Sequence, residues 1–350
     1  MIRIGLCGLG YWGKNLFRAL SGNPRIELAA VADLSAETRA NLAVSHPGLK
    51  LYADAMELIS DPDIDAVVIA TPVAHHYRQA KVALDQGKHV LVEKPMCTTT
   101  AEADDLIARA DLYGLTLMAD HTFLFHPAVL KLGELVRSGA LGQISYYDSQ
   151  RINLGLFQPD VNVLWDLAPH DISIIDYLFG GEPVHVEASG YCHVNPGFPD
   201  IAYLTFHYPN SMVAHLNLSW MSPVKVRRIA VGGSDKMVVW DDLNRDEPLK
   251  IYDSGITTHP RQDREIILPS YRIGSVTSPR LTGNEPLVDV VENFRQVICG
   301  EAAPRSDGRV GRRVLRTLER AQAALDLSLK QVAASLPAEI PAETYAIAAK

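Results

Sequence analysis

The sequence predicts a two-domain protein, in which a doubly wound parallel α/β sheet is followed by an α+β domain with a large, mostly antiparallel sheet. Three observations predict this. The 350 residues are enough for about two domains. Up to about residue 120, short apolar runs alternate with helical stretches, which is typical of a parallel sheet covered on both faces. Over 183–268 the helical period gives way to alternating segments separated by turn residues, which indicates antiparallel strands.

The first predicted domain covers residues 1–120. Its strands are continuous runs of Val, Ile, Leu and Ala that are too short for helices, and each is followed by a stretch with helical character. We expect right-handed crossovers between the strands. The expected strands are 2–8, 26–32, 65–71, 88–93 and 115–119, and the expected helices are 11–21, 36–45, 76–86 and 99–113.

The second predicted domain covers residues 121–335. A helix over 127–138 ends at Gly139, and another over 166–179 is stopped by Gly180 and Gly181. The Pro- and Ala-rich tail, 336–350, is either loosely held or packed on a partner subunit. The expected strands are 143–151, 202–207, 212–219, 227–231 and 237–240, and two closing helices are expected at 287–299 and 310–330.

Composition excludes several classes of protein. Hydrophobic residues make up 47% and charged residues 21%, as in a globular enzyme, and the net charge of −8 disfavours nucleic acid and anionic membranes as partners. No apolar run is long enough to span a membrane, and the four separated cysteines indicate free thiols. The start of the chain has no secretory pattern, so we expect a cytoplasmic protein. The twelve histidines form no metal-binding motif, and no metal is expected.

A glycine motif follows the first predicted strand and opens the first helix. Gly8 permits a tight turn, Gly10 allows close approach of a pyrophosphate, and Gly13 allows the helix to pack on the strand. Asp33 lies 20 residues beyond Gly13, where a carboxylate binds a ribose 2′-hydroxyl and repels a 2′-phosphate. The pattern predicts a Rossmann domain that binds NAD, with NADP less favoured. The residues expected to line the cofactor here are Gly8, Gly10, Tyr11, Trp12, Gly13 and Asp33.

A second singular stretch, His89-Val-Leu-Val-Glu-Lys-Pro95, ends a predicted strand. The strand delivers Lys94 to the carboxyl edge of the sheet, where open α/β sheets bind ligands. With the glycine motif and with Ala70-Thr71-Pro72, this stretch resembles the Gfo/Idh/MocA family of sugar and cyclitol oxidoreductases over nearly the whole chain. The resemblance implies an NAD(P)-dependent dehydrogenase acting on CH–OH groups. It also implies that Thr71, Pro72, His76, Glu93, Lys94 and Pro95 line the cofactor.

The family carries an Asp, and a His four residues later, on a helix of its second domain. Asp166 and His170 have this spacing, which places both side chains on one face of a helix. Without the resemblance, Asp166 could be a helix N-cap and His170 a buried, hydrogen-bonded histidine. The resemblance implies that Lys94, Asp166 and His170 are catalytic and that all three also bind the substrate.

Oxidation of a secondary alcohol removes a proton from oxygen and a hydride from carbon. By resemblance His170 is the preferred general acid/base, Lys94 polarises the oxygen, and Asp166 orients either partner or binds a substrate hydroxyl. A relay in which neutral Lys94 is the base stays open.

Other positions depart from the family or carry weaker signals. Val73 replaces a common asparagine and Leu124 a common arginine, which removes one polar contact to the cofactor and one to the substrate. His76 is either a cofactor neighbour or a satisfied histidine at a helix start. Further substrate contacts are expected from His121, Arg151 and Asn153, the last two being equally explained as ordinary polar residues at a strand end.

The strings at 151–155 and 165–171 most resemble the subgroup that acts on nucleotide-linked sugars, such as UDP-N-acetyl-hexose 3-dehydrogenases. The leading hypothesis is therefore an NAD-dependent sugar or nucleotide-sugar dehydrogenase. The alternatives are a non-catalytic NAD(H)-binding regulator and a reductase of a non-sugar carbonyl or imine. An exposed face of the second-domain sheet predicts a homodimer or homotetramer.

Overall fold

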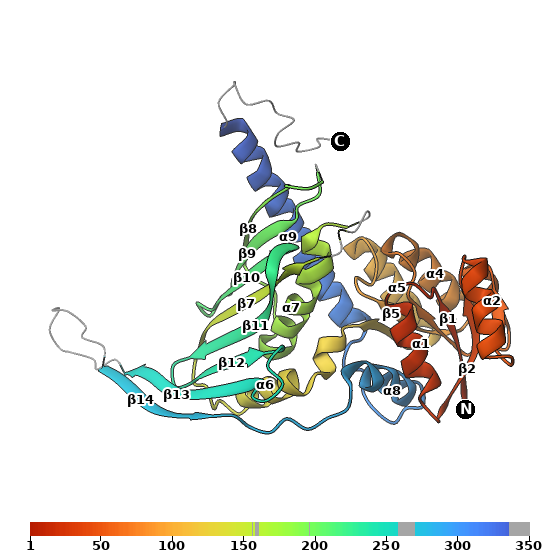
Figure 1. Ribbon diagram of the computed structural model, residues 1–350, viewed down its shortest axis with the longest axis horizontal. Coiled ribbons are helices and arrows are strands. Elements are labelled where there is room, and N and C mark those ends of the chain that lie inside the picture. The colour runs from red at the N-terminus through yellow and green to blue at the C-terminus, as the bar shows by residue number, and fades with distance from the viewer. Residues whose placement is uncertain (156, 158–160, 196, 258–269, 336–350) are drawn as a thin grey trace. The chain divides into compact units, whose positions relative to one another are not determined.

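The computed structural model describes residues 1–155, 157, 161–195, 197–257 and 270–335 (Figure 1). Its backbone divides into two compact units. The first contains residues 1–126 and 283–316, and the second contains 127–282 and the remainder of the last helix. The sequence places 283–316 in the second domain, whereas in the structure these residues cluster with the first. The predicted tail, 336–350, lies outside the described residues.

The first unit is a six-stranded parallel sheet with the order β3-β2-β1-β4-β5-β6. The order reverses between β1 and β4, so right-handed crossovers place helices on both faces. Helices α4 and α5 pack together, and α1 packs on β1, β2 and α8. Its strands are β1 (Ile2–Cys7), β2 (Ile26–Ala32), β3 (Lys50–Tyr52), β4 (Ala66–Ile69), β5 (His89–Glu93) and β6 (Leu117–Asp120), and its helices are α1 (Gly13–Ser21), α2 (Ala36–Ser45), α3 (Ala55–Ile59), α4 (Val73–Asp85), α5 (Thr100–Tyr113), the short 3-10 helix η1 (Thr122–Phe125) and α8 (Pro286–Ile298).

The second unit contains an eight-stranded sheet with the order β14-β13-β12-β11-β7-β10-β9-β8. Only the β10–β7 pair is parallel among these strands. Helix α7 packs on β7, β9 and β10. The elements are α6 (Pro127–Arg137), β7 (Ile144–Leu154), α7 (Val163–Phe179), β8 (His185–Tyr191), β9 (Ile201–His207), β10 (Val213–Ser219), β11 (Met221–Gly233), β12 (Met237–Asp241), β13 (Leu249–Thr257), β14 (Ser270–Thr277) and α9 (Gly308–Ser335), whose first turns belong to the first unit.

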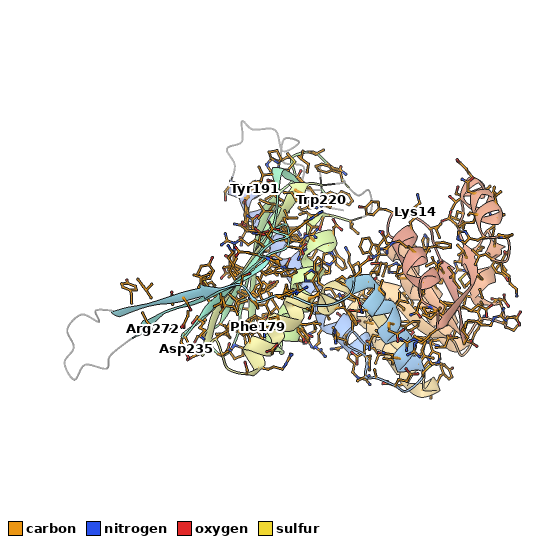
Figure 2. All side chains as sticks on the ribbon, turned by 60° about the horizontal axis from the view of Figure 1, so that its bottom comes forward. Lys14, Phe179, Tyr191, Trp220, Asp235 and Arg272 are labelled. Carbon is orange, nitrogen blue, oxygen red and sulfur yellow. The ribbon has the colours of Figure 1, made fainter. Side chains whose placement is uncertain are left out.

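Strands β12, β13 and β14 form one end of this sheet, and polar contacts hold β14 in place there. Arg272 of β14 donates to the carboxylate of Asp253 at 2.7 Å and to the carbonyl oxygen of Asp235 (Figure 2). These contacts fix the last strand to the turn that precedes β12.

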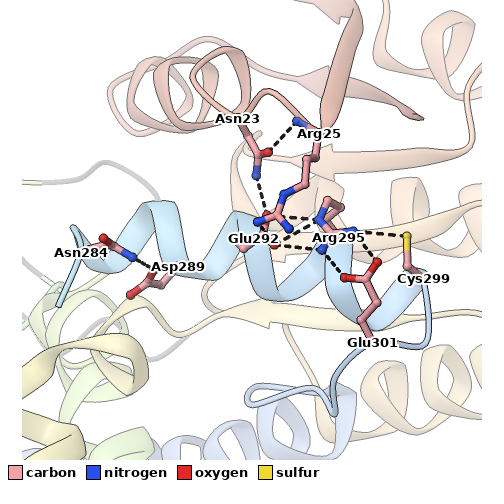
Figure 3. Close-up of polar contacts among 8 residues, drawn as sticks. All are labelled: Asn23, Arg25, Asn284, Asp289, Glu292, Arg295, Cys299 and Glu301. Carbon is pink, nitrogen blue, oxygen red and sulfur yellow. Dashed lines mark hydrogen bonds and ion pairs between the residues drawn. The ribbon is translucent and has the colours of Figure 1, made fainter.

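Helix α8 belongs to the first unit, and the carboxylate of Glu292 on this helix connects it to the loop between α1 and β2. Glu292 accepts hydrogen bonds from Asn23 at 2.9 Å and from Arg295, and it forms an ion pair with Arg25 at 2.7 Å (Figure 3). Arg295 also binds Glu301, just beyond the helix. The loop between α1 and β2 is thereby tied to a segment more than 260 residues further along the chain.

The predicted fold class is confirmed, with differences in detail. Elements β3, α3, η1, β8, β13 and β14 were not expected from the sequence. Helix α4 begins at Val73 rather than at residue 76, and α7 begins at Val163 rather than at 166. The α7 start follows from Asn162, whose side chain accepts hydrogen bonds from the backbone N–H groups of Leu164 and Trp165. Asp166 is therefore in the first turn and is not the N-cap, and Pro169 lies inside the helix.

Candidate active site

The glycine loop between β1 and α1 has the geometry of a phosphate cradle. Gly8 has a φ of +93°, and a Cβ there would lie 2.8 Å from the carbonyl oxygen of Ala70. A Cβ at Gly13 would lie 2.2 Å from the carbonyl oxygen of Gly8, whereas one at Gly10 would meet nothing within 4 Å. Gly8 and Gly13 are thus required by the turn itself, whereas Gly10 leaves open space. That space fits the close approach of a pyrophosphate.

Asp33 joins this loop to the end of β2. Its carboxylate accepts hydrogen bonds from the backbone N–H of Leu9 at 2.7 Å and of Ser35 at 2.8 Å. Arg39 donates to the carbonyl oxygens of Asp33 and Leu34. The carboxylate is half-buried at the loop, which is the position from which it would bind a ribose hydroxyl.

His76 links the two loops that follow β4 and β5. Its Nε2 lies 2.6 Å from the carbonyl oxygen of Thr71 and its Nδ1 lies 2.9 Å from that of Pro95. Burial lowers the pKa of His76, and the two carbonyl contacts oppose this shift. The hydroxyl of Thr71 donates to Gln79 at 2.8 Å. His76 therefore holds together the loops that carry the Thr71-Pro72 and Glu93-Lys94-Pro95 motifs.

At the carboxyl edge of β5, Lys94 follows the last strand residue and precedes a cis-proline, Pro95. Its backbone N–H donates to the carboxylate of Glu93 at 2.9 Å. Next to it, β6 ends in Asp120, which pairs in register with Glu93. His121 follows and is 2% exposed. Burial and, to a smaller extent, the charge of Lys94 lower the pKa of His121 to about 4.

Asp120 was missed at the sequence level. The signal that could have found it is a carboxylate at the end of the predicted strand that neighbours the strand of Glu93. Both ring nitrogens of His121 are buried and lack a hydrogen-bond partner among the described residues, as does one oxygen each of Glu93 and Asp120. Such buried polar atoms fit a polar ligand, as the nicotinamide end of a dinucleotide would be.

In the second unit, Asp166 and His170 lie one turn apart on α7, and both are partly exposed. The Asp166 carboxylate accepts a hydrogen bond from the indole of Trp220 at 3.2 Å. The structure thus brings these two predicted residues together on one helix face, whereas Lys94 and the cofactor-lining residues belong to the first unit.

The next residue, Asp171, anchors α7 on the sheet. It is fully buried and accepts hydrogen bonds from Ser149 at 2.7 Å, Tyr147 at 3.1 Å and Arg151 at 2.8 Å. Arg151, 4% exposed, therefore pairs inside the second unit. Asn153 donates to the carbonyl oxygen of Leu154. Substrate contact by Arg151 or Asn153 stays a prediction.

Within the described part of the chain, no three His, Cys, Asp or Glu side chains are arranged to hold a metal ion. None of the helices described there is long and apolar enough to cross a membrane.

Comparison with known proteins agrees with this architecture. Residues 2–121 match the family model described as "Oxidoreductase family, NAD-binding Rossmann fold", and residues 129–239 match the GFO/IDH/MocA C-terminal domain. The UDP-N-acetylglucosamine 3-dehydrogenase of Acidithiobacillus ferrooxidans is 31% identical over 333 residues, covering 94% of this chain and 99% of that protein. Its crystal structure aligns with a TM-score of 0.78 at 29% identity, over 93% of this chain and 98% of that one.

Two further solved structures are similar. An oxidoreductase from Magnetospirillum magnetotacticum is 32% identical with a TM-score of 0.77, over 91% of this chain and 99% of that chain. The WlbA dehydrogenase of Bordetella pertussis, solved with NADH and UDP-GlcNAcA, is 19% identical with a TM-score of 0.74, over 92% and 96% of the two chains. At that identity the second similarity shows the fold alone.

The fold and the glycine loop define an NAD(P)-binding oxidoreductase with a Rossmann domain and a second α+β domain. More particularly, the chain belongs to the Gfo/Idh/MocA family, which confirms the resemblance found in its sequence. Its relatives include a UDP-N-acetylglucosamine 3-dehydrogenase and an inositol 2-dehydrogenase.

Proposed function

We propose that this protein is an NAD-dependent dehydrogenase that oxidises a secondary hydroxyl of a nucleotide-linked hexose, with C3 as the reacting carbon. The observation that carries the proposal is the match, over 94% of the chain, to a protein named UDP-N-acetylglucosamine 3-dehydrogenase. The preference for NAD over NADP is supported by Asp33, whose carboxylate at the glycine loop would repel a 2′-phosphate.

The cofactor would be held by the glycine loop, by Asp33 and by the loops that follow β4 and β5. When bound, its nicotinamide ring supplies the hydride acceptor. We assign proton removal from the substrate hydroxyl to His170 and stabilisation of the developing negative charge on that oxygen to Lys94. Asp166 would orient a substrate hydroxyl from the same face of α7 as His170.

A substrate panel tests the proposal. NADH formation would be followed with UDP-N-acetyl-hexoses, UDP-hexuronates, free hexoses, inositols and non-sugar alcohols, each with NAD+ and NADP+. We expect turnover to favour a UDP-linked sugar with NAD+. Turnover confined to non-sugar carbonyl compounds would indicate the alternative reductase. Tight NAD(H) binding without turnover in either direction would indicate a regulator.

A further inference from the structure

The carboxyl edge of the first-unit sheet holds a buried pair of carboxyl groups that the proposed chemistry does not use. Glu93 is the last residue of β5 and Asp120 the last residue of β6, and the two strands pair them in register. Glu93 is 7% exposed and Asp120 is 1% exposed. Because in-register neighbours on adjacent parallel strands carry their side chains to the same face of the sheet, the two carboxyl groups lie next to each other.

Each carboxyl group has one satisfied oxygen. Glu93 Oε2 accepts the backbone N–H of Lys94 at 2.9 Å, and Asp120 Oδ1 accepts the hydroxyl of Thr122 at 2.6 Å. Glu93 Oε1 and Asp120 Oδ2 are buried, and neither oxygen accepts a hydrogen bond from any of the described residues. Two buried carboxylates facing each other without a donor would be costly, whereas one shared proton lets one group donate to the other.

The charged and polar groups around the pair support this. Burial, together with the charge of Asp120, raises the pKa of Glu93 well above its usual value, and the nearby Lys94 opposes the shift. Burial also raises the pKa of Asp120, while contacts with Thr122, Glu93 and Trp12 lower it. The pKa of His121 is about 4, so this imidazole is neutral at pH 7 and is not a competing source of a proton there.

The position of the pair points to a ligand that carries positive charge. In a sheet of this order, a dinucleotide extends from the glycine loop across the point between β1 and β4, toward the carboxyl ends of the following strands. The two ring nitrogens of His121, which have no hydrogen-bond partner in the described part of the chain, indicate a polar ligand beside the pair. The oxidised nicotinamide ring is positively charged, whereas the reduced ring is neutral.

We propose that Glu93 and Asp120 share one proton in the cofactor-free protein and release it to solvent when NAD+ binds, so that NAD+ binding, but not NADH binding, is coupled to proton release. The inference rests on the proposed function, because it requires that the chain bind NAD. The O–H bond of the shared carboxyl group breaks, the proton passes to solvent or buffer, and no electron moves. Asp120 thus acts through Glu93, as a positioning residue. Because only NAD+ binding releases a proton, rising pH would strengthen the binding of NAD+ relative to that of NADH.

Calorimetric titration in buffers of different protonation enthalpy tests the coupling. We expect up to one proton released per NAD+ and none per NADH. As pH rises through the titration of the pair, the Kd of NAD+ should fall by up to about tenfold per pH unit, while the Kd of NADH should stay unchanged. Equal proton release for the two nucleotides, or none for either, would overturn the inference.

Variants assign the proton to the pair. Asp120→Asn leaves an amide that can donate to an ionised Glu93, so the pH slope and the proton release should both disappear, and Glu93→Gln should do the same. Glu57→Gln, on the exposed side of α3, is the matched control and should keep both. Retention of full proton release in Asp120→Asn would contradict the assignment.

A measurement on the cofactor-free protein distinguishes the shared proton from its release on NAD+ binding. Infrared spectroscopy at neutral pH should show a carboxylic acid band in the native chain that is absent from Asp120→Asn; its absence from the native chain would overturn the shared proton. Binding of NAD+ without proton release would overturn the coupling alone. Failure of both nucleotides to bind would contradict the proposed function and the coupling with it.

Discussion

Single buried residues in this protein set the positions of the residues next to them. Asp171 has no exposure, and its three partners on β7 fix the register of α7 over the sheet. His170 and Asp166 lie on the same helix, so the contacts of Asp171 with β7 also determine where these two residues lie. The buried Asp171–Arg151 ion pair therefore has a structural role that supports the candidate catalytic residues.

Asp171→Asn should destabilise the second unit strongly, because it removes the buried carboxylate charge with which the guanidinium of Arg151 pairs at 2.8 Å. We expect a loss of about 3–5 kcal/mol in the free energy of unfolding, measured by urea denaturation. Glu134→Gln, which breaks the exposed Lys131–Glu134 pair, is the control and should cost less than about 1 kcal/mol. Similar losses in the two variants would contradict the structural role.

Lys94 and His170 should affect turnover far more than cofactor binding. Lys94→Met and His170→Asn should each lower kcat by about 10²–10⁴-fold, because each removes a group that acts on the reacting oxygen. The Kd of NAD+, measured by fluorescence titration, should stay within a few-fold of the native value. Unchanged turnover in both variants would remove the catalytic assignment.

Asp61 should contribute stability that depends on pH. The N–H of Asp63 and the hydroxyl of Tyr52 lower the pKa of Asp61 to about 2. Because the pKa is lowered relative to an unfolded value of about 3.9, the stabilisation is present above pH ~4 and is lost as pH falls toward 2. Asp61→Asn should thus be less stable than the native chain at pH 7 and lose less stability between pH 4 and pH 2 in thermal melts. An acid slope as steep as that of the native chain would contradict this role.

At the scale of elements, the chain was most predictable where a local pattern fixes a local shape. Gly8, Gly10, Gly13 and Asp33 lie in one strand–turn–helix–strand unit, and the structure forms that unit around them. The site residues that depend on pairing between distant segments were not predictable in this way. The position of Asp120 beside Glu93 follows only from the register of β6 on β5. The ion pair of Arg151 with Asp171 likewise forms only because α7 packs on β7.

Helix ends and edge strands were less predictable for related reasons. Pro169 suggests a first turn, yet the helix starts six residues earlier because Asn162 provides the cap. Strands β8 and β14, at the two edges of the sheet, and β13, next to β14, mix polar and apolar residues, so their alternation is weak in the sequence.

The glycine loop yields a pair of substitutions with opposite expectations. Gly13→Ala should prevent the loop from closing, because its Cβ would lie 2.2 Å from a backbone oxygen, and should destabilise the first unit. Gly10→Ala meets open space and should leave stability within about 0.5 kcal/mol, while weakening NAD+ binding by blocking the pyrophosphate. Thermal melts and cofactor titration of both variants check this. Native NAD+ affinity in Gly10→Ala would contradict the assigned path of the cofactor.

At the scale of the whole molecule, the second-unit sheet supports a prediction of self-association. One face receives α7, and the other carries partly exposed side chains that include Tyr146 and Tyr203. Exposed aromatic residues on an extended sheet face are typical of subunit interfaces. A homodimer or homotetramer, like the expected cytoplasmic location, stays a prediction.

Sedimentation at micromolar concentration should show a dimer or a tetramer, and Tyr203→Lys should shift the distribution toward monomer. Leu34→Lys, at an exposed position of the first unit, is the control and should not. A monomeric native chain would contradict the prediction.

We expect a hydride to pass between C3 of a nucleotide-linked hexose and nicotinamide on this protein. The most direct measurement uses UDP-N-acetylglucosamine deuterated at C3, incubated with NAD+ and the protein, followed by mass spectrometry of the cofactor. We predict NADH that carries the deuterium. NAD+ that binds tightly but stays unreduced, or NADH formed without the label, would contradict this expectation.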